Sequence, residues 1–221
     1  MGLADMVCAL KTTLFTDAFE SEPCVIHCEK RNEGFETSSK VQYVARVGNF
    51  IDGGKEYTGA LQILRVILSY DYLWQNVRVK GGAYGCMSNF TRIGEGYFMS
   101  YRDPNLEKTN AVYEGVVDYL KGFSVSERDM TKYIIGTISN MDQPMTPAAK
   151  GDRSMNLYMN HVSEEMIRKE RNEVLDASKE DIRALAEIVE AVLKQNYLCV
   201  IGSEEKIEEQ KDLFMERRSI F

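Results

Sequence analysis

Residues 76–90 read NVRVKGGAYGCMSNF, and they place a double glycine between a long apolar segment and a run of strand character. The preceding segment, residues 57–75, is apolar nearly all round, which predicts a buried helix. Arg78 then stands near the negative C-terminal end of that helix, and Gly81-Gly82 can cap it. The stretch therefore predicts a helix that ends at a glycine turn and is followed by a strand.

A hairpin is expected directly behind this turn. The segments AYGCMSNF and GYFMSYR read as strands, and residues 91–95, with Gly94, join them. Asp103-Pro104 is typical of a helix start, with Asp at the N-cap and Pro at the first helical position, so we expect a helix to about Lys121.

Helices dominate the second half of the chain. Ser126 and Asp129 resemble a capping box that opens a helix ending near Met141. Further elements are predicted in order: helices over about 148–160, 164–176 and 179–195, a strand in NYLCVIG, and a terminal helix in SEEKIEEQKDLF.

The first 50 residues read as a helix over 3–19, a strand in CVIHCEK, a polar turn-rich stretch in KRNEGFETSSK, and a strand in VQYVARVGNF. Strands thus come in pairs early, helices cluster behind them, and one strand returns late. This order predicts the α+β class, a mostly antiparallel sheet with helices packed on it. No repeat or linker divides the chain, so we expect a single α+β domain over residues 1–221.

Composition excludes several classes of protein. The net charge of −7 argues against a nucleic-acid partner, which would need a basic face. No apolar run reaches the roughly 18 residues needed to span a bilayer, so no membrane partner is expected. Five scattered cysteines favour free thiols in a reducing compartment, and the N-terminus does not resemble a signal peptide. These features predict a cytoplasmic protein.

Metal ligands are scarce, because the chain has only two histidines. His161 begins HVSEE, which differs by one residue from the zinc-binding H-x-x-E-H, but the second histidine is replaced by Glu165. A helix start capped by Ser163 accounts for the same residues. In a strand, Cys24 and Cys28 would lie about 13 Å apart with His27 on the opposite face, which is too far for one metal.

No nucleophile has its partners in the sequence. G-x-S-x-G, the P-loop and the dinucleotide-binding glycine pattern are absent. Cys86 near Arg78 is a conceivable nucleophile, but nothing brings a histidine to it. The residues therefore contain no recognisable catalytic machinery.

Arg78 and Tyr84 allow two interpretations. In the first, Arg78 interacts with the helix end and Tyr84 is an ordinary strand aromatic. In the second, the glycine turn reverses the chain and brings both polar tips to one rim of the sheet. A guanidinium and a phenol that converge there offer hydrogen-bond donors to a peptide carbonyl or a developing oxyanion.

Three segments together identify a family: RVKGGAYG, GYFMSYRDPN and IIGTISNMDQPMTPAAKG. In this order they resemble the last domain of presequence-protease-like enzymes. These are inverted H-x-x-E-H (inverzincin) zinc metalloendopeptidases of the pitrilysin/insulysin superfamily. The resemblance is good from about residue 57 to 203 and weaker outside that range.

The resemblance implies four related α+β domains in two halves that close around an unfolded peptide substrate. Zinc and its ligands belong to the N-terminal catalytic half, which would be the partner of this chain. In the last domain an arginine and a tyrosine of R-x-x-G-G-x-Y reach the peptide beside the zinc. Those positions are Arg78 and Tyr84, which are thus implied to bind substrate near the scissile bond.

The chain departs from the family in having no H-x-x-E-H and about a quarter of the full length. It is therefore expected to be a C-terminal fragment or a separately produced domain, with no catalytic residue, metal or cofactor of its own and no peptidase activity alone. Whether it counts as an enzyme is left open. A non-catalytic structural subunit with the same fold is the alternative, and a free-standing peptide-binding module is a weaker one. An organellar matrix becomes the expected location if the parent enzyme carries a transit peptide.

Overall fold

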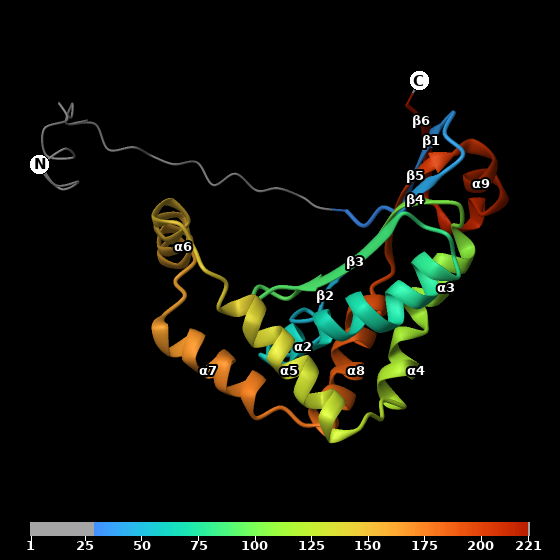
Figure 1. The fold of residues 1–221 in the computed structure, drawn as a ribbon. Helices are drawn as coiled ribbons and strands as arrows, with labels where there is room; N and C mark the ends of the chain where they lie inside the picture. The colour runs from blue at the N-terminus through green and yellow to red at the C-terminus, as the bar shows by residue number, and fades with distance from the viewer. Residues whose placement is uncertain (1–28, 221) are drawn as a thin grey trace, which may run out of the picture.

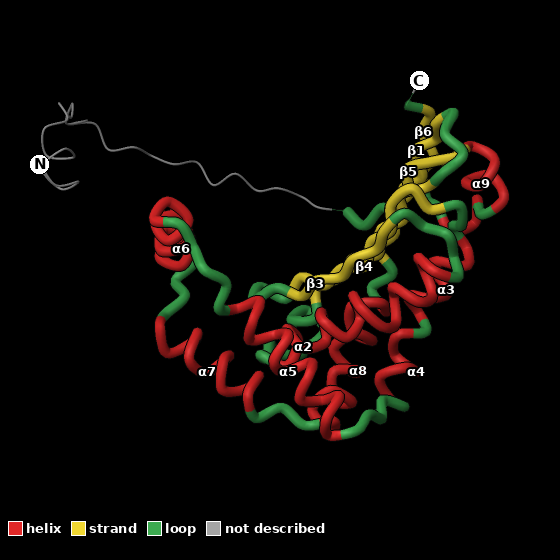
Figure 2. Tube along the Cα trace, viewed as in Figure 1, coloured by secondary structure: helices red, strands yellow, loops and turns green. Residues whose placement is uncertain are grey.

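The computed structural model describes residues 29–220, which form one six-stranded sheet with most of the helices against one face (Figures 1 and 2). The strands lie in the order β3-β4-β2-β5-β1-β6. Their bounds are β1 Glu33–Thr37, β2 Gln42–Asn49, β3 Gly85–Phe90, β4 Glu95–Asp103, β5 Tyr197–Ser203 and β6 Glu216–Ser219.

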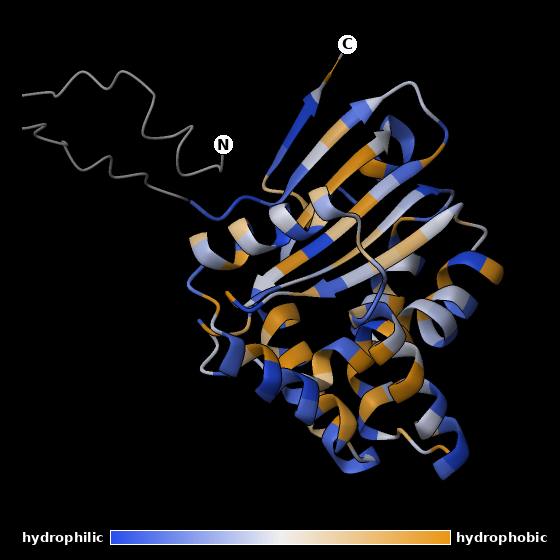
Figure 3. Cartoon of the chain, turned by 60° about the vertical axis from the view of Figure 1, so that its left-hand side comes forward, coloured by the Kyte–Doolittle hydropathy of each residue, from blue (hydrophilic) through white to orange (hydrophobic). Residues whose placement is uncertain are grey.

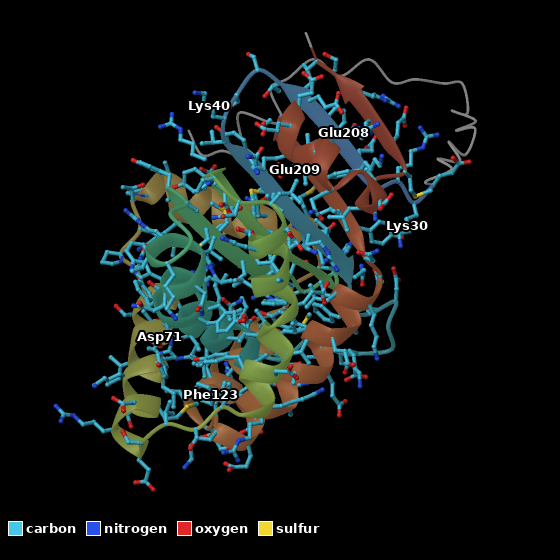
Figure 4. The ribbon with its side chains drawn as sticks, turned by 90° about the vertical axis from the view of Figure 1, so that its right-hand side faces the viewer. Lys30, Lys40, Asp71, Phe123, Glu208 and Glu209 are labelled. Carbon is cyan, nitrogen blue, oxygen red and sulfur yellow. The ribbon has the colours of Figure 1, made fainter. Side chains whose placement is uncertain are left out.

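The helices fill most of the chain between β2 and β5. They are α2 Ala60–Ile67, the π-helical segments η1 Leu68–Tyr72 and η2 Trp74–Val79, α3 Glu107–Glu114, α4 Val116–Lys121, α5 Glu127–Met141, α6 Pro147–Met159, α7 Glu164–Leu175, α8 Lys179–Lys194, α9 Glu204–Glu209 and the short 3-10 turn η3 Lys211–Leu213. Figure 4 places Glu208 and Glu209 of α9 at the end of the molecule far from Asp71 of η1 and from Phe123. α9 packs against β1 and β5, whereas α2 and η1 pack against β3.

The sheet is mixed, and the α+β class is confirmed. β3, β4, β2 and β5 pair antiparallel in that order, whereas β1 pairs parallel with both β5 and β6. The expected hairpin is present as β3 and β4, with Gly85 opposite Tyr101 at the open end and Phe90 opposite Gly96 at the turn.

Buried and exposed side chains alternate along the strands, and this alternation shows which face of the sheet the helices cover. In β2 the side chains of Val44 and Arg46 are buried under the helices, while Tyr43 and Val47 are partly exposed on the other face. Below the covered face, α2 and α8 contribute more buried aliphatic side chains than any other helix, and the apolar sides of the helices gather there (Figure 3). Because every second side chain of a strand points the same way, one layer of helices is enough to make the core.

Two strands were not expected. β1 lies within the stretch that reads as turn-rich, and β6 follows the terminal helix α9, which is shorter than predicted. β1 is held by pairing with β5, more than 160 residues later, and β6 pairs in turn with β1. Short polar strands of this kind have no local signal, because their pairing partners are distant in sequence.

The helix expected from Asp103-Pro104 begins later, at Glu107, and is interrupted at Gly115. The Asp103 side chain is buried and accepts hydrogen bonds from the Thr109 hydroxyl at 2.7 Å and from the Asn105 N–H at 2.9 Å. The predicted N-cap was therefore wrong by three residues, because Asp103 ends β4 and bonds forward across an intervening turn.

The later helices agree with the sequence. Ser126 caps α5, with its hydroxyl oxygen accepting from the Asp129 N–H at 3.1 Å, and α5 ends at Met141 as predicted. The bounds of α6, α7 and α8 differ from the expected ones by at most one residue at each end.

Some expectations cannot be compared with this structure. The helix over 3–19 and the strand in CVIHCEK, with Cys24, His27 and Cys28, lie outside the described residues. Over residues 29–220, no helix is both long enough and apolar enough to cross a bilayer.

Candidate functional site

The glycine turn after η2 reverses the chain as a helix cap. Gly82 adopts φ +81° and donates its N–H to the Arg78 carbonyl at 2.9 Å, and Ala83 donates to the Val77 carbonyl at 3.2 Å. A Cβ on Gly81 would lie only 2.4 Å from the Val77 oxygen. Both positions thus require glycine, one for its conformation and the other for the close backbone approach.

The helix that enters this turn is widened. Lys80 donates its N–H to the Gln75 carbonyl at 3.0 Å, five residues back, which is the π-helical pattern. On this helix the Arg78 guanidinium carbon lies 4.2 Å from the ring centroid of Trp74. At that distance the cation stacks on the indole face, which stabilises one position of the arginine side chain.

Tyr84 lies just beyond the turn, and its ring faces the Arg78 guanidinium. Its ring is 6.0 Å from the Arg78 guanidinium carbon and 5.5 Å from that of Arg102, and its centroid is 5.6 Å from that of Tyr101. The Tyr84 N–H donates to the Arg102 carbonyl at 3.3 Å, which fixes the backbone beside the end of β4. The turn therefore brings Arg78 and Tyr84 together, as the second interpretation of the sequence required.

The arginine is not neutralised by a neighbouring acid. Arg78 is exposed and makes no ion pair with a carboxylate among residues 29–220, although seven other arginines of this part of the chain do. Tyr84 is 59% exposed, so both polar tips are open to a ligand. A charged donor without a partner is available to a carbonyl or an oxyanion.

Cys86, on β3 next to this cluster, does not have the properties of a nucleophile. Burial and the Asp103 carboxylate raise the pKa of its thiol to about 11, and Arg78 offsets this only in part. At neutral pH the thiol is therefore protonated, and only the thiolate is reactive.

Metal ligands are not gathered in the described residues. Residues 29–220 contain no group of three or more His, Cys, Asp and Glu side chains placed to hold one ion. His161 is exposed in the turn between α6 and α7, and the Ser163 hydroxyl beside it accepts from the Met166 N–H at 3.2 Å. HVSEE is thus a capped helix start.

Three further side chains surround Arg78 and Tyr84 and were not expected from the sequence: Trp74, Tyr101 and Arg102. For Trp74 a signal existed, because it precedes Arg78 by four residues, and such residues are neighbours on a helix. Tyr101 and Arg102 had no such signal, since only the pairing of β3 with β4 brings them to Tyr84.

Comparison with known proteins gives consistent results. Residues 32–204 match the family described as the PreP C-terminal domain. Protein HypA of Clostridium perfringens is 47% identical over 202 residues, which cover 91% of this chain and 21% of that protein. Presequence protease 1, chloroplastic/mitochondrial, of Arabidopsis thaliana is 36% identical over 179 residues, which cover 80% of this chain and 17% of the relative. This chain therefore spans about a fifth of the length of these relatives.

Solved structures with low sequence identity share the fold. The inactive peptidase domain of a putative zinc protease from Bordetella parapertussis superimposes with a TM-score of 0.56 at 13% identity. The match covers 75% of this chain and 91% of that domain. At this identity the likeness concerns the fold alone.

Proposed function

Because this chain belongs to the PreP C-terminal domain family, we propose that it is the substrate-facing, non-catalytic domain of a zinc-dependent endopeptidase that degrades unfolded peptides. In this proposal it is the last of four related domains and works with the N-terminal catalytic half of the same protein. The non-catalytic role is proposed by analogy with the Bordetella parapertussis domain of the same fold, which is described as an inactive peptidase domain.

The observation that carries the proposal is the convergence of Arg78 and Tyr84. The two groups come from opposite sides of a turn that only glycines permit, they lie 6.0 Å apart, and no acid competes for the guanidinium in the described residues. A cation and a phenol that are exposed side by side are both available to a peptide, which supports a binding role.

Each residue then has a separate role. Arg78 donates charged hydrogen bonds to a peptide carbonyl, and these strengthen as negative charge develops on the oxygen during hydrolysis. The Tyr84 hydroxyl donates a second hydrogen bond to the same region of the peptide, and two bonds together restrict the orientation of the bound peptide. In this proposal the zinc and the activated water belong to the catalytic half.

Two measurements test the proposal. Trp74 is the only tryptophan of the chain and stacks on Arg78, so its fluorescence should change when an unstructured peptide binds, and Arg78→Ala should weaken that binding. With the catalytic half present, Arg78→Ala should lower kcat by about 100-fold, the typical loss for one oxyanion-stabilising donor, and Tyr84→Phe by less.

The control is Arg128→Gln, which removes an exposed arginine at the start of α5 and should leave binding and kcat unchanged. Kinetics that are unchanged in both Arg78→Ala and Tyr84→Phe would contradict the assigned roles and favour a structural subunit with this fold. Zinc-dependent cleavage of a peptide by the purified chain alone would also overturn the proposal.

The cellular location follows the parent protein in this proposal. The Arabidopsis relative is named chloroplastic/mitochondrial, which supports an organellar matrix where a transit peptide is present and the cytoplasm where it is not.

A further inference from the structure

A polar hollow lies near the turn of the β3-β4 hairpin. It has a volume of about 510 Å³ and is enclosed by α2, η1, the C-terminal part of α5, α6, α7 and Arg92 of the hairpin turn. Figure 1 shows the hairpin reaching toward the segment between α5 and α6. We call this hollow the arginine groove, because Arg65, Arg92 and Arg153 line it.

Positive charge in the arginine groove exceeds negative charge. Its one acidic side chain is Glu170, which is buried and already accepts from Arg92, from the Tyr57 hydroxyl at 2.8 Å and from Gln62 at 3.3 Å. Three arginines against one carboxylate leave an excess of two positive charges, in a chain whose net charge is −7.

Two of these arginines are available. Arg65 and Arg153 are exposed, and neither forms an ion pair with a carboxylate of residues 29–220. The charge of Arg153 acts on the Asp142 carboxylate, but that carboxylate already accepts from two Arg171 nitrogens at 2.6 and 2.8 Å. The amides of Asn140 and Gln143 add neutral donors to the lining. Guanidinium and amide donors together suit a carboxylate.

The arginine groove and the Arg78-Tyr84 site lie along the same two elements. Tyr70 lines the groove, and Trp74 and Arg78 follow it at intervals of four residues, all three exposed. On the other side, edge strand β3 runs from the residue after Tyr84 to within two residues of Arg92. Even at the α-helical rise of roughly 1.5 Å per residue, which exceeds that of the π-helical segments η1 and η2, Tyr70 lies at most about 12 Å and Arg65 at most about 20 Å from Arg78 along the helix.

From this geometry we propose that the arginine groove binds a carboxylate of the same peptide that Arg78 and Tyr84 hold. An extended chain advances roughly 3.3 Å per residue, so the carboxylate lies at most about six residues from the carbonyl at Arg78. It belongs either to an acidic side chain or to the C-terminus of the peptide. The inference rests on the proposed function, since it takes the peptide at Arg78 as its starting point.

The test compares matched peptides on the purified chain. Short fluorescein-labelled unstructured peptides carry a single Glu or a Gln at successive positions, and each is made with a free or an amidated C-terminus. Fluorescence anisotropy gives the affinity, and Trp74 fluorescence reports on the Arg78 site. At low salt the best Glu peptide should bind about tenfold more tightly than its Gln counterpart, as expected for one charge-assisted interaction. A preference for the free acid over the amide instead assigns the carboxylate to the C-terminus.

Variants of the groove arginines test whether the arginine groove causes the tighter binding of the Glu peptide. Arg65→Gln should reduce the ratio of the two affinities to about threefold, and the double variant R65Q/R153Q should abolish it. Arg128→Gln, an exposed arginine at the far end of α5 from Asn140, should leave the ratio unchanged. All of these side chains are exposed, and circular dichroism checks that the variants remain folded.

The outcomes separate the two proposals. Equal affinities of the wild-type chain for Glu, Gln, free-acid and amidated peptides, with a Trp74 response, overturn the groove and leave the Arg78 site standing. A preference that survives R65Q/R153Q also overturns the groove. A preference lost in R65Q/R153Q, but with no Trp74 response and no effect of Arg78→Ala, supports the groove and contradicts the proposed function. No binding of any peptide overturns both.

Discussion

Arg78 stacks on an indole where many arginines of this chain pair with carboxylates. The stack on Trp74 places the guanidinium without neutralising it, which a salt bridge would do. An aromatic partner therefore suits an arginine that has to meet a ligand.

Trp74→Ala should weaken peptide binding about two- to fivefold, since an exposed cation–π contact contributes about 0.5–1 kcal/mol. Trp74→Phe keeps an aromatic face and should bind nearly as the wild type does. Anisotropy measures both, because neither variant retains the tryptophan signal. Equal losses in the two variants would show that the ring does not position Arg78.

Cys86 reports on the same arginine through its thiol. Because its pKa is raised to about 11, the thiolate fraction at pH 9 is about fiftyfold smaller than for an unperturbed cysteine of pKa near 9. Alkylation of Cys86 at pH 9, followed by peptide mass spectrometry, should be correspondingly slow and should accelerate as the pH rises toward 11.

Arg78 lowers the pKa of Cys86, so Arg78→Ala should slow this alkylation further. Arg128→Gln, which changes the net charge equally, is the control and should have no effect. Faster alkylation in Arg78→Ala would mean that the arginine shields the thiol sterically more than it stabilises the thiolate.

At the scale of elements, the turn between η2 and β3 decides whether the site exists. Its glycines connect a helix cap to the edge strand, and the Asn105 side chain donates to the Gly81 carbonyl at 2.6 Å. The turn is thus tied both to the helix and to the segment after β4. A change in its conformation should move Arg78 relative to Tyr84.

Gly82→Ala tests this directly. At φ +81° an alanine is strained by about 1–2 kcal/mol, although no atom lies closer to its Cβ than Pro104 at 3.5 Å. The free energy of unfolding in urea should fall by that amount, and peptide binding should weaken as well.

Gly151→Ala is the matched control. Gly151 lies in exposed helix α6 with nothing within 4 Å of its Cβ position, so alanine should stabilise the helix by about 0.5–1 kcal/mol. A similar loss of stability in both variants would exclude the backbone conformation of Gly82 as the cause.

For the whole molecule, Glu170 connects parts that are distant in sequence. From α7 it binds Arg92 of the hairpin turn, Tyr57 before α2, and Gln62 on α2. Burial, followed by the charge of Glu170, raises the pKa of the Tyr57 hydroxyl, so the phenol remains a donor at neutral pH. These contacts fix one wall of the arginine groove.

Glu170→Ala should lower the free energy of unfolding by about 1–3 kcal/mol, because it leaves the partly buried Tyr57 and Gln62 donors without their buried acceptor. Glu56→Gln, in an exposed loop, removes the same charge and should change stability by less than about 0.5 kcal/mol. Urea denaturation compares the two. Equal stabilities would mean that water replaces the carboxylate without cost.

Much of the fold could be predicted from the sequence, because the sequence signals for these elements are local. The hairpin, the capped start of α5 and the bounds of α6 to α8 follow from side-chain periodicity, turn residues and caps, each of which acts within a few positions. The start of the helix after β4 was misread because Asp103 ends β4, and its carboxylate accepts from the Thr109 hydroxyl instead of capping the helix from the N-cap position, which Leu106 occupies. The functional family was readable from three segments in order.

The sequence by itself determined the α+β class, the glycine turn, and the presence of Arg78 and Tyr84 on either side of it. Only the tertiary structure decided that β1 and β6 join the sheet, that Trp74, Tyr101 and Arg102 gather around the pair, and that three arginines line one groove. The physical reason is the separation along the chain between the residues that interact. Caps and turns depend on neighbours in the chain, whereas strand pairing and charge clusters form between residues that only the folded chain brings together.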